Sequence, residues 1–335
     1  MAKTVDLTKI TYYVTAVHPD GRLMHLEGVA ENIAWEENES EVATRLNLTL
    51  RDIPFEDSRL SKKLALCTAV YLYAKWDDSG KQEIFRGTIW EWEHSQTNDD
   101  AIVVTCYDLL YYLQKSQDSM YWPKGRNTSD ICKDILEAWG VPLSEYSGPS
   151  ITHEKTLYKN KAISAMLTET LDAAKKKTGE VGIIRAVEGE CQILTRGENS
   201  EVWDFTADTN LVSASDKYTM ADLVTRVILV GKDDKNGRPK VEATVDGKTE
   251  YGILQTVKSI GSTKLADAKK EAEELIEEKG KPKRTITFVA PEFPAVRKGD
   301  VIHAKTNKLI GYFYVKGVSH NATSKSMQME VEPYE

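Results

Sequence analysis

Residues 8–106 contain several short runs in which apolar and polar side chains alternate. Leu46, Leu48 and Leu50 alternate with polar residues, which is the period-2 pattern of a half-buried strand. The same reasoning predicts four more strands, at 10–16, 66–76, 82–94 and 102–106. Turn signals at His18–Gly21 and Asp77–Gly80 follow two of them. Several strands joined by turns predict a barrel or a sandwich.

A short helix is predicted at Asp108–Lys115, and residues 123–200 then follow a different pattern. A second helix follows Asn127 and ends at Gly140. A third helix is predicted at Lys161–Lys177, with an apolar stripe at helical spacing. Its stripe is made of Ile163, Met166, Leu167 and Leu171. Two short strands are expected at Gly182–Ala186 and Cys191–Leu194. This part of the chain therefore reads as a small α+β domain.

Residues 201–335 return to β patterning. Strands are predicted at Val224–Val230, Lys240–Val245, Thr285–Val289, Val301–Ala304, Tyr312–Val318 and Met327–Val331. A helix at 264–279 interrupts them, with Leu265, Ala268, Ala272, Leu275 and Ile276 on one face. We expect this apolar face to dock on the C-terminal β domain. The order along the chain is β-rich, then α+β, then β-rich.

Length and charge narrow the class of protein. A chain of 335 residues is long enough for two or three domains. The net charge of −8 argues against a general nucleic-acid binder, which needs a basic face to neutralise phosphates. No run approaches the roughly 20 apolar residues of a membrane-spanning helix, and Met1–Asp6 has no secretory signal pattern. We therefore expect neither a membrane partner nor export through a signal peptide.

Cysteines and histidines are scattered and suggest no metal site. The four cysteines are far apart and are expected to be buried free thiols, with Cys191 the least clear. The six histidines lack the spacing of a helical zinc site and are expected at the surface or in hairpins. Asp233–Gly237 resembles the start of a calcium loop, but Lys232 falls on the first ligand position, so a hairpin turn is favoured.

No reactive constellation emerges from the remaining residues. The chain has no Gly-x-Ser-x-Gly elbow and no phosphate-binding Gly-x-x-x-x-Gly-Lys loop. We therefore predict no catalytic residue, no cofactor-binding residue and no metal ligand. Trp90 and Trp92 are placed on one face of a predicted strand, where they are either interface anchors or part of a core.

Several segments carry a family resemblance. The first is Tyr107–Ser116, which is followed by Tyr121–Gly125 and a capped helix. The second is Pro291–Ile302, a Pro-rich turn with Lys-Gly-Asp before a strand. The third is Gly311–His320, followed by Met327–Val331. In this order and spacing the segments resemble the hub proteins of PBSX-type and Mu-type contractile phage tails, over essentially the whole chain.

The resemblance implies an architecture that is mostly β within the α+β class. Two tail-tube-like β-barrel domains, 1–118 and 201–335, flank a small α+β domain at 119–200, and the helix 264–279 is inserted in the second barrel. The second barrel is not visible as a sequence repeat of the first, because that helix has no counterpart in residues 1–106. The internal duplication is therefore carried over from the family.

The resemblance also implies a function and partners. Hub proteins of this kind form a homotrimer whose ring joins the hexameric tail tube to the trimeric spike. Wedge proteins of the baseplate are expected to contact the peripheral small domains, and a tape measure protein is a further candidate partner. The expected location is the baseplate of a virion or tail-like particle, assembled in the host bacterial cytoplasm. No enzymatic activity, cofactor or sequence-specific nucleic-acid binding is expected.

Two other classes of function remain as alternatives. A tail-associated cell-wall hydrolase would need a defined carboxylate pair or a zinc site. A cell-wall-binding module would present clustered aromatic residues on an exposed face. Residues 150–200 contain Tyr158 as their only aromatic residue, which argues against such a module in the middle domain.

Overall fold

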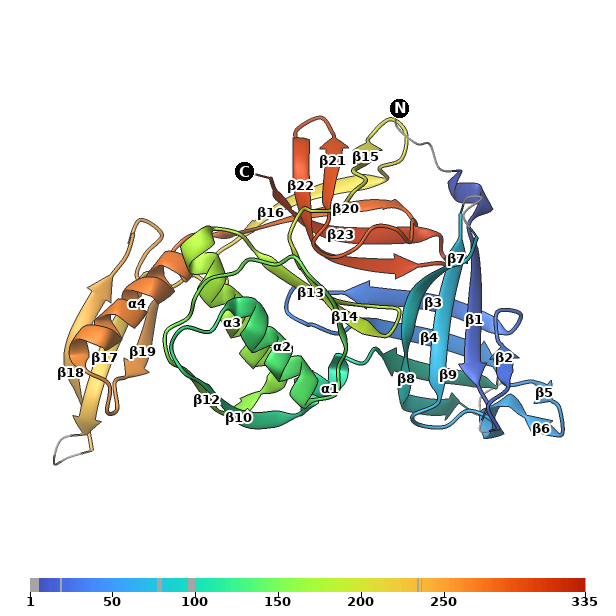
Figure 1. The fold of residues 1–335 in the computed structure, drawn as a ribbon. Coiled ribbons are helices and arrows are strands. Elements are labelled where there is room, and N and C mark those ends of the chain that lie inside the picture. The colour runs from blue at the N-terminus through green and yellow to red at the C-terminus, as the bar shows by residue number, and fades with distance from the viewer. Residues whose placement is uncertain are drawn as a thin grey trace. The chain divides into compact units, whose positions relative to one another are not determined.

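The computed structural model describes residues 6–18, 20–76, 80–95, 100–233, 235 and 237–334. The chain is mostly β and divides into two compact units. The larger unit is Met1–Ala214 with Thr287–Glu335, and the smaller is Ser215–Ile286. None of the helices in the described part is long and apolar enough to cross a membrane. Large antiparallel sheets account for most of the structure, which confirms the predominance of β in the predicted fold class (Figure 1).

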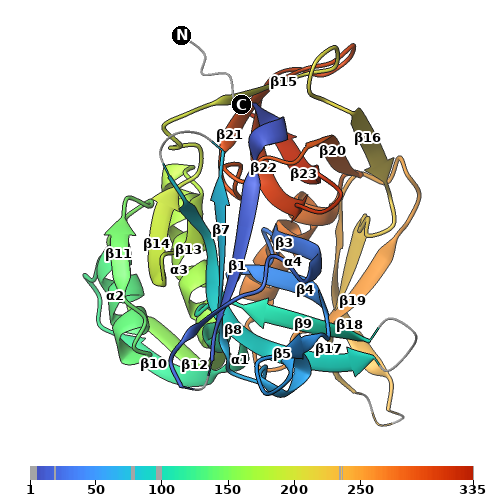
Figure 2. The same cartoon turned by 90° about the vertical axis from the view of Figure 1, so that its right-hand side faces the viewer.

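The N-terminal half-sheet is antiparallel throughout and has the order β3-β4-β9-β8-β7-β1-β2 (Figure 2). Its strands are β1 (Thr11–Val17), β2 (Leu23–His25), β3 (Ala30–Glu37), β4 (Arg45–Arg51), β7 (Ala69–Lys75), β8 (Gln82–Ser95) and β9 (Ala101–Tyr107). A small hairpin, β5 (Pro54–Phe55) with β6 (Ser58–Arg59), lies between β4 and β7 along the chain, and short 3-10 helices span Leu7–Lys9 and Leu60–Lys62.

Alternating burial explains why these strands form. Leu46, Leu48 and Leu50 of β4 are buried, and the intervening side chains are not, which is the predicted period-2 pattern. All five predicted strands are confirmed, whereas β2 and β3 were not predicted. β7 begins at Ala69 rather than at residue 66, because Leu66 lies outside the strand and is exposed. The predicted turns at 18–21 and 77–80 include Pro19 and residues 77–79, which lie outside the described residues.

The middle segment, residues 108–195, forms a small α+β layer with its own core. Its elements are α1 (Tyr111–Lys115), β10 (Gln117–Trp122), α2 (Thr128–Ala138), β11 (Leu143–Tyr146), β12 (Thr156–Ala162), α3 (Ile163–Thr178), β13 (Gly182–Val187) and β14 (Glu190–Thr195). The predicted stripe of α3 is buried, and Gly179 ends the helix at a φ of 81°. Val42 and Ala43, from the β3–β4 turn, also belong to this core.

The C-terminal half-sheet contains the predicted closing strands and two that were not predicted, β15 and β16. Its strands are β15 (Trp203–Thr206), β16 (Ser213–Thr219), β20 (Lys283–Pro291), β21 (Val301–Lys305), β22 (Ile310–Asn321) and β23 (Ser326–Pro333). Residues 318–321 of β22 pair with residues 34–37 of β3. Through this β3–β22 joint the two half-sheets become one 13-stranded sheet.

Both half-sheets have the same strand order. Apart from the short β2, each contains six strands, whose order across the sheet is second, third, sixth, fifth, fourth, first along the chain. The equivalent strands are β1 and β15, β3 and β16, β4 and β20, β7 and β21, β8 and β22, and β9 and β23. One difference is direction: β1 is antiparallel to β7, whereas β15 is parallel to β21. A duplication that the sequence does not reveal is thus visible in the topology.

The segment between β16 and β20 is an insertion between the second and third strands of the C-terminal half-sheet, and it forms most of the smaller unit. It contains β17 (Arg226–Asp233), β18 (Pro239–Asp246), β19 (Gln255–Ser259) and α4 (Leu265–Lys279). The sheet order is β18-β17-β19, with β19 parallel to β17. The predicted turn between β17 and β18 includes Asp234 and Asn236, which lie outside the described residues.

Helix α4 docks by the predicted apolar face, but its partner differs from the expectation. Ala268 and Ala272 are buried against Val227 and Leu229 of β17. The sequence assigned β17 and β18 to the same domain as the closing strands, whereas here they form a separate three-stranded sheet that carries the helix. The reason is local: β17 and its neighbours bury their apolar side chains on α4. The boundaries 1–118, 119–200 and 201–335 remain a prediction.

Candidate functional site

A turn of the same construction precedes the fourth strand of each half-sheet. In Ala65–Thr68, Thr68 Oγ1 accepts a hydrogen bond from the Ala65 amide (3.2 Å), and the Thr68 amide donates to the Ala65 carbonyl (3.1 Å). In Arg297–Asp300, Asp300 Oδ2 accepts from the Arg297 amide (2.9 Å), and the Asp300 amide donates to the Arg297 carbonyl (3.2 Å). The third residue is left-handed in both turns, with φ 64° at Cys67 and 91° at Gly299.

The fifth strand meets each turn in the same way. Ile89 donates to the Thr68 carbonyl (3.0 Å) and accepts from the Cys67 amide (2.8 Å). Val315 donates to the Asp300 carbonyl and accepts from the Gly299 amide, both at 2.8 Å. A β-bulge follows immediately in both strands, before Glu91 and before Gly317. These shared contacts align the two half-sheets residue by residue.

The alignment pairs two acid–histidine contacts. Asp52-Ile53-Pro54 follows the third strand of the N-terminal half-sheet, and Glu292-Phe293-Pro294 begins at the end of the third strand of the other. His94 Nε2 lies 3.2 Å from Asp52 Oδ2, and His320 Nδ1 lies 3.0 Å from Glu292 Oε1. Burial raises the pKa of Glu292, although His320 opposes the shift.

The expectation that the histidines are surface or hairpin residues is wrong for His153 and His320. His153 is buried beside Thr128, with Nε2 2.8 Å from Thr128 Oγ1. His320 is buried and stacks on Trp35 at 4.5 Å between ring centroids. Both rings have polar partners in the interior, which is what makes their burial tolerable.

The C-terminal turn is covered by the N-terminal half-sheet. Glu37, the last residue of β3, accepts from the Lys298 amide (3.0 Å) and from Arg297 Nε (2.9 Å). Lys298 Nζ donates to the carbonyl oxygens of Asn38 (3.2 Å) and Glu41 (2.7 Å). All of these groups are buried or partly buried, so the turn and the β3–β22 joint form one connected polar junction.

Electrostatics hold Glu37, at the centre of this junction, in its charged form. Burial alone would raise the pKa of Glu37, but the neighbouring Arg297 and Lys298 outweigh it and bring that pKa down to about 2. Arg185 of β13 adds a contact from the middle segment, with Nη1 3.1 Å from Asp300 Oδ1. The junction therefore ties together the two half-sheets and the middle segment.

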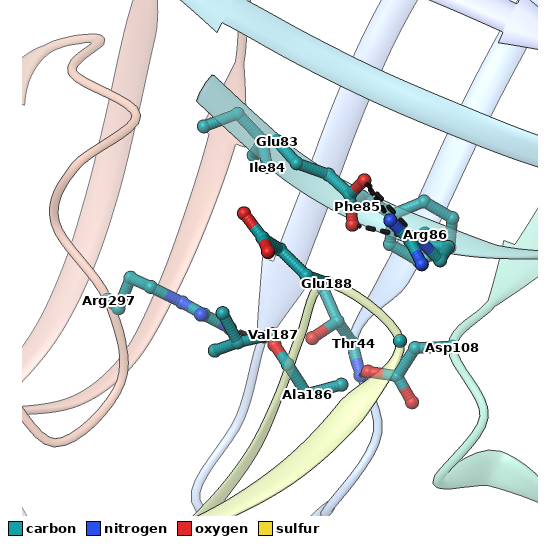
Figure 3. Close-up of a pocket in the computed structure, with 11 residues that line it drawn as sticks. Thr44, Glu83, Ile84, Phe85, Arg86, Asp108, Ala186, Val187, Glu188 and Arg297 are labelled. Carbon is teal, nitrogen blue, oxygen red and sulfur yellow. Dashed lines mark hydrogen bonds and ion pairs between the residues drawn. The ribbon is translucent and has the colours of Figure 1, made fainter. Parts of the chain in front are cut away.

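Asp108 lies close to this junction, in a small pocket lined by β8, the β13–β14 turn and Arg297 (Figure 3). Its carboxylate accepts from the amides of Thr44 (2.7 Å) and Leu110 (2.9 Å). Burial raises the pKa of Asp108 to about 6 in spite of these hydrogen bonds. Its contacts fix the start of the middle segment to the end of the β3–β4 turn.

The N-terminal turn is open, in contrast. Leu66, the counterpart of Lys298, is 61% exposed. Cys67 is exposed as well, so the expectation of four buried thiols is wrong for this residue, while Cys106, Cys132 and Cys191 are buried. Trp92, the counterpart of the buried Val318, is 37% exposed. The N-terminal half-sheet therefore has an exposed apolar surface at the position where the C-terminal half-sheet is covered by β3.

Trp90 and Trp92 do not act as one patch. Trp90 falls in the bulge of β8 and packs edge-on against Tyr107, Tyr111 and Tyr112. Trp92 pairs with Val104 in the register, and its ring neighbour is His94. Trp90 thus belongs to an aromatic cluster, and Trp92 to the open surface.

Sequence reasoning found no site residue and missed the polar junction. The only local signal for the junction is the Pro291–Ile302 segment, which carries part of the family resemblance and contains Glu292, Arg297, Lys298 and Asp300. Glu37 and Arg185 carry no local signal, because their partners lie far away along the chain. Among the residues that the structure describes, no group of three or more His, Cys, Asp or Glu side chains is arranged to hold a metal ion.

Comparison with solved structures agrees with this architecture. The chain is similar to the tail protein from Neisseria meningitidis MC58, with 11% identity, a TM-score of 0.64 and 96% of each chain covered. It is also similar to the 43 kDa tail protein of prophage MuSo2 from Shewanella oneidensis, with 10% identity, a TM-score of 0.65, and coverage of 96% of this chain and 98% of that one.

A third similar structure comes from a secretion system. The E. coli c3393 protein is described as a component of the type VI secretion system with structural similarity to the T4 tail proteins gp27 and gp5. It shares 10% identity and a TM-score of 0.52 over 91% of this chain and 74% of its own. A sequence search of curated proteins finds no match. At these identities the likeness is one of fold.

The predicted resemblance to hub-type tail proteins is confirmed at the level of the fold. The sequence profile of one family, described as YQBQ-like, matches residues 33–332. This range includes the middle segment, the insertion and both half-sheets, except for β1, β2, the first residues of β3 and the last residue of β23. Because this match extends over most of the chain, the protein belongs to the YQBQ-like family.

Proposed function

We propose that the chain is a structural subunit of the baseplate hub of a contractile phage tail or tail-like particle. In this role three copies form a ring that joins the hexameric tail tube to the trimeric spike. The observation that supports the proposal most directly is the repeat within one chain: two half-sheets with the same strand order, the same turn and the same bulge.

The repeat suits a symmetry adapter. A sixfold tube cannot match a threefold spike contact for contact. Three chains that each carry two equivalent half-sheets give six equivalent positions toward the tube and three toward the spike. Closed cyclic symmetry is the usual way in which a homo-oligomer avoids open-ended growth. In this reading the half-sheets are the tube-like barrels, within the domains 1–118 and 201–335, and the domain 119–200 lies between them.

The expected partners are the tail tube protein, the spike protein and the wedge proteins, with the tape measure protein as a further candidate. The similarity to tail proteins and to a type VI secretion component supports a place in such a particle. The middle segment and the insertion have cores of their own, so they can carry wedge contacts without altering the repeated half-sheets. The proposed location is the baseplate, after assembly in the bacterial cytoplasm.

Electron microscopy of the assembled particle tests the proposal. We expect three copies in one ring, with the half-sheets of successive chains alternating at six equivalent positions. Six separate copies, or half-sheets that do not superpose on their shared strands, would contradict it. A monomer in isolated solution is compatible with the proposal, because the tube or the spike can act as the template for assembly.

A zymogram tests the non-enzymatic part of the proposal. Purified full-length protein is expected to leave peptidoglycan intact. A lytic band that disappears when a single carboxylate is replaced would favour the tail-associated hydrolase instead.

A further inference from the structure

We infer that β16 of one copy pairs with residues 92–95 of β8 in a neighbouring copy, which repeats between chains the β3–β22 joint within each chain. This inference rests on the proposed function, because it specifies the contact by which three copies would close a ring.

The same strand edge is filled in the C-terminal half-sheet and open in the N-terminal half-sheet. Residues 310–314 of β22 pair with β21, and residues 318–321 of the same edge pair with β3, while β23 occupies the opposite edge. The equivalent strand β8 pairs with β7 up to Thr88 and with β9 on its opposite edge. Beyond the turn at Cys67, no described strand covers the edge of β8 over residues 92–95.

The strand β16 has a neighbour on only one side within the described part of the large sheet. β3 pairs with β4 on one edge and with β22 on the other. Its equivalent, β16, pairs with β20 alone and ends the strand order of the large sheet in the described part of the chain. Each copy therefore has one unfilled position and one strand of the kind that fills it.

Both unpaired edges carry apolar side chains in contact with solvent. Leu66 is 61% exposed and Trp92 37% exposed beside the open edge of β8. Val212, directly before β16, is 71% exposed, and Tyr218 within it is 62% exposed. Soluble proteins normally protect free edges, because unpaired backbone groups are templates for another strand. Exposed apolar residues on two complementary edges indicate that both become buried.

A second copy of this chain is the occupant that the structure favours. The filled joint already shows that a strand at the β3 position fits an edge of the β22 kind. The only described strand with the β3 position and a free edge is β16. The contact joins the C-terminal half-sheet of one copy, through β16, to the N-terminal half-sheet of the next copy, through β8. It is therefore a head-to-tail contact. Head-to-tail contacts form a closed ring when the rotation from one copy to the next divides a full turn evenly. If the contact between copies reproduces the β3–β22 joint, all joints in the ring are equivalent.

Cysteine cross-linking tests the contact directly. Residues opposite each other on paired strands have Cβ atoms about 4.5–5.5 Å apart, close to disulfide range. Starting from Cys67→Gly, which removes the exposed thiol, Glu93→Cys would be combined in turn with Ser213→Cys, Ala214→Cys and Ser215→Cys. The full-length chain would be expressed together with the tube and spike proteins of its particle. We expect disulfide-linked dimers and trimers in one register, and none with either cysteine alone or with Glu93→Cys plus Leu23→Cys.

Leu66→Glu provides an independent measurement. A carboxylate buried in the joint without a partner should weaken assembly at least about tenfold, while the folded monomer should be unaffected, because Leu66 is exposed there. Leu23→Glu, at 60% exposure on β2, is the matched control and should assemble like the wild type.

The outcomes separate this inference from the proposed function. Three copies in the ring without any cross-link between β8 and β16, or equal assembly of Leu66→Glu and Leu23→Glu, overturns the inference and leaves the hub proposal standing. A particle with a different number of copies overturns the hub proposal, and the inferred contact is then rejected with it.

Discussion

The two half-sheets have the same strand order and the same turn, but their turns lie in different surroundings. The C-terminal turn is covered by Glu37 and by Ile183, and its lysine is buried. The N-terminal turn has Leu66 in place of that lysine and is open to solvent. The comparison teaches that backbone hydrogen bonds define the shared scaffold, whereas the neighbours of each copy determine which side chains it carries. Four substitutions test this conclusion, from the largest expected effect to the smallest.

Glu37→Gln should have the largest effect, because Arg297 and Lys298 would remain buried without their counter-charge. We expect a loss of about 3–5 kcal/mol in the free energy of unfolding at neutral pH, measured by denaturant titration. The matched control Glu39→Gln breaks the ion pair between the exposed Glu39 and the partly buried Lys316, and it should cost less than about 1 kcal/mol. Equal effects of the two substitutions would contradict the assigned role of the junction.

The same variant has a pH signature. The pKa of Glu37 is lowered from 4.5 to about 2 on folding, so the unfolded chain binds more protons between these values. The stabilisation is therefore complete above pH 4.5 and is lost as the pH falls toward 2. Glu37→Gln should flatten this acid limb, which a series of unfolding curves from pH 2 to pH 6 would show.

Alanine substitutions at the two left-handed positions should affect the two half-sheets differently. A Cβ on Gly299 would lie 2.8 Å from Ile183 Cγ1, in addition to the cost of a φ of 91°, so Gly299→Ala should cost about 2–4 kcal/mol. Cys67 already has a Cβ at a φ of 64° and is exposed, so Cys67→Ala should change stability by less than about 0.5 kcal/mol. Similar losses in the thermal unfolding of both variants would mean that the two environments do not differ as described.

Leu275→Asp tests the insertion, which is the largest difference between the two half-sheets. Leu275 is half-buried against the β17 sheet, so a charge there should cost about 2 kcal/mol. The loss should appear in hydrogen exchange of the inserted unit and leave β4 and β22 protected as before. Unchanged exchange in β17 and β18 would show that α4 does not pack on them.

Thr68→Ala should have a smaller effect than Glu37→Gln, Gly299→Ala or Leu275→Asp. It removes one hydrogen bond, from the Ala65 amide to Thr68 Oγ1, and solvent can replace that bond because the N-terminal turn is open. We expect about 1 kcal/mol by denaturant titration. The equivalent Asp300→Ala also leaves Arg185 without its partner and should cost clearly more. A reversed order would break the proposed equivalence of the two turns.

Much of the fold could be predicted from the sequence because most strands bury one face. In β4 and β23, for example, apolar and polar residues alternate, and this local pattern predicts the strands. β3 was missed because its inward face ends in the buried Glu37, which reads as a polar position although its partners make it an interior one. Segments with few buried residues, such as β16, gave no pattern either.

The duplication and the junction could not be predicted for a physical reason. The two turns share φ values and hydrogen bonds, which are properties of the backbone. Their sequences, Ala-Leu-Cys-Thr and Arg-Lys-Gly-Asp, have no residue in common. Likewise, the burial of His320 depends on Trp35 and Glu292 together, and no local pattern brings these three residues into contact.

The β3–β4 turn bears on how this chain could have evolved. In the N-terminal copy its residues Val42 and Ala43 are buried in the middle core, and its carbonyl groups at Asn38 and Glu41 hold Lys298. An insertion that lengthened this loop would disrupt both the core of the middle segment and the hydrogen bonds that hold Lys298. The equivalent loop of the C-terminal half-sheet spans 220–282 and contains the whole insertion, β17, β18, β19 and α4. After a duplication, selection would thus have kept one loop short and allowed the other to acquire a new domain.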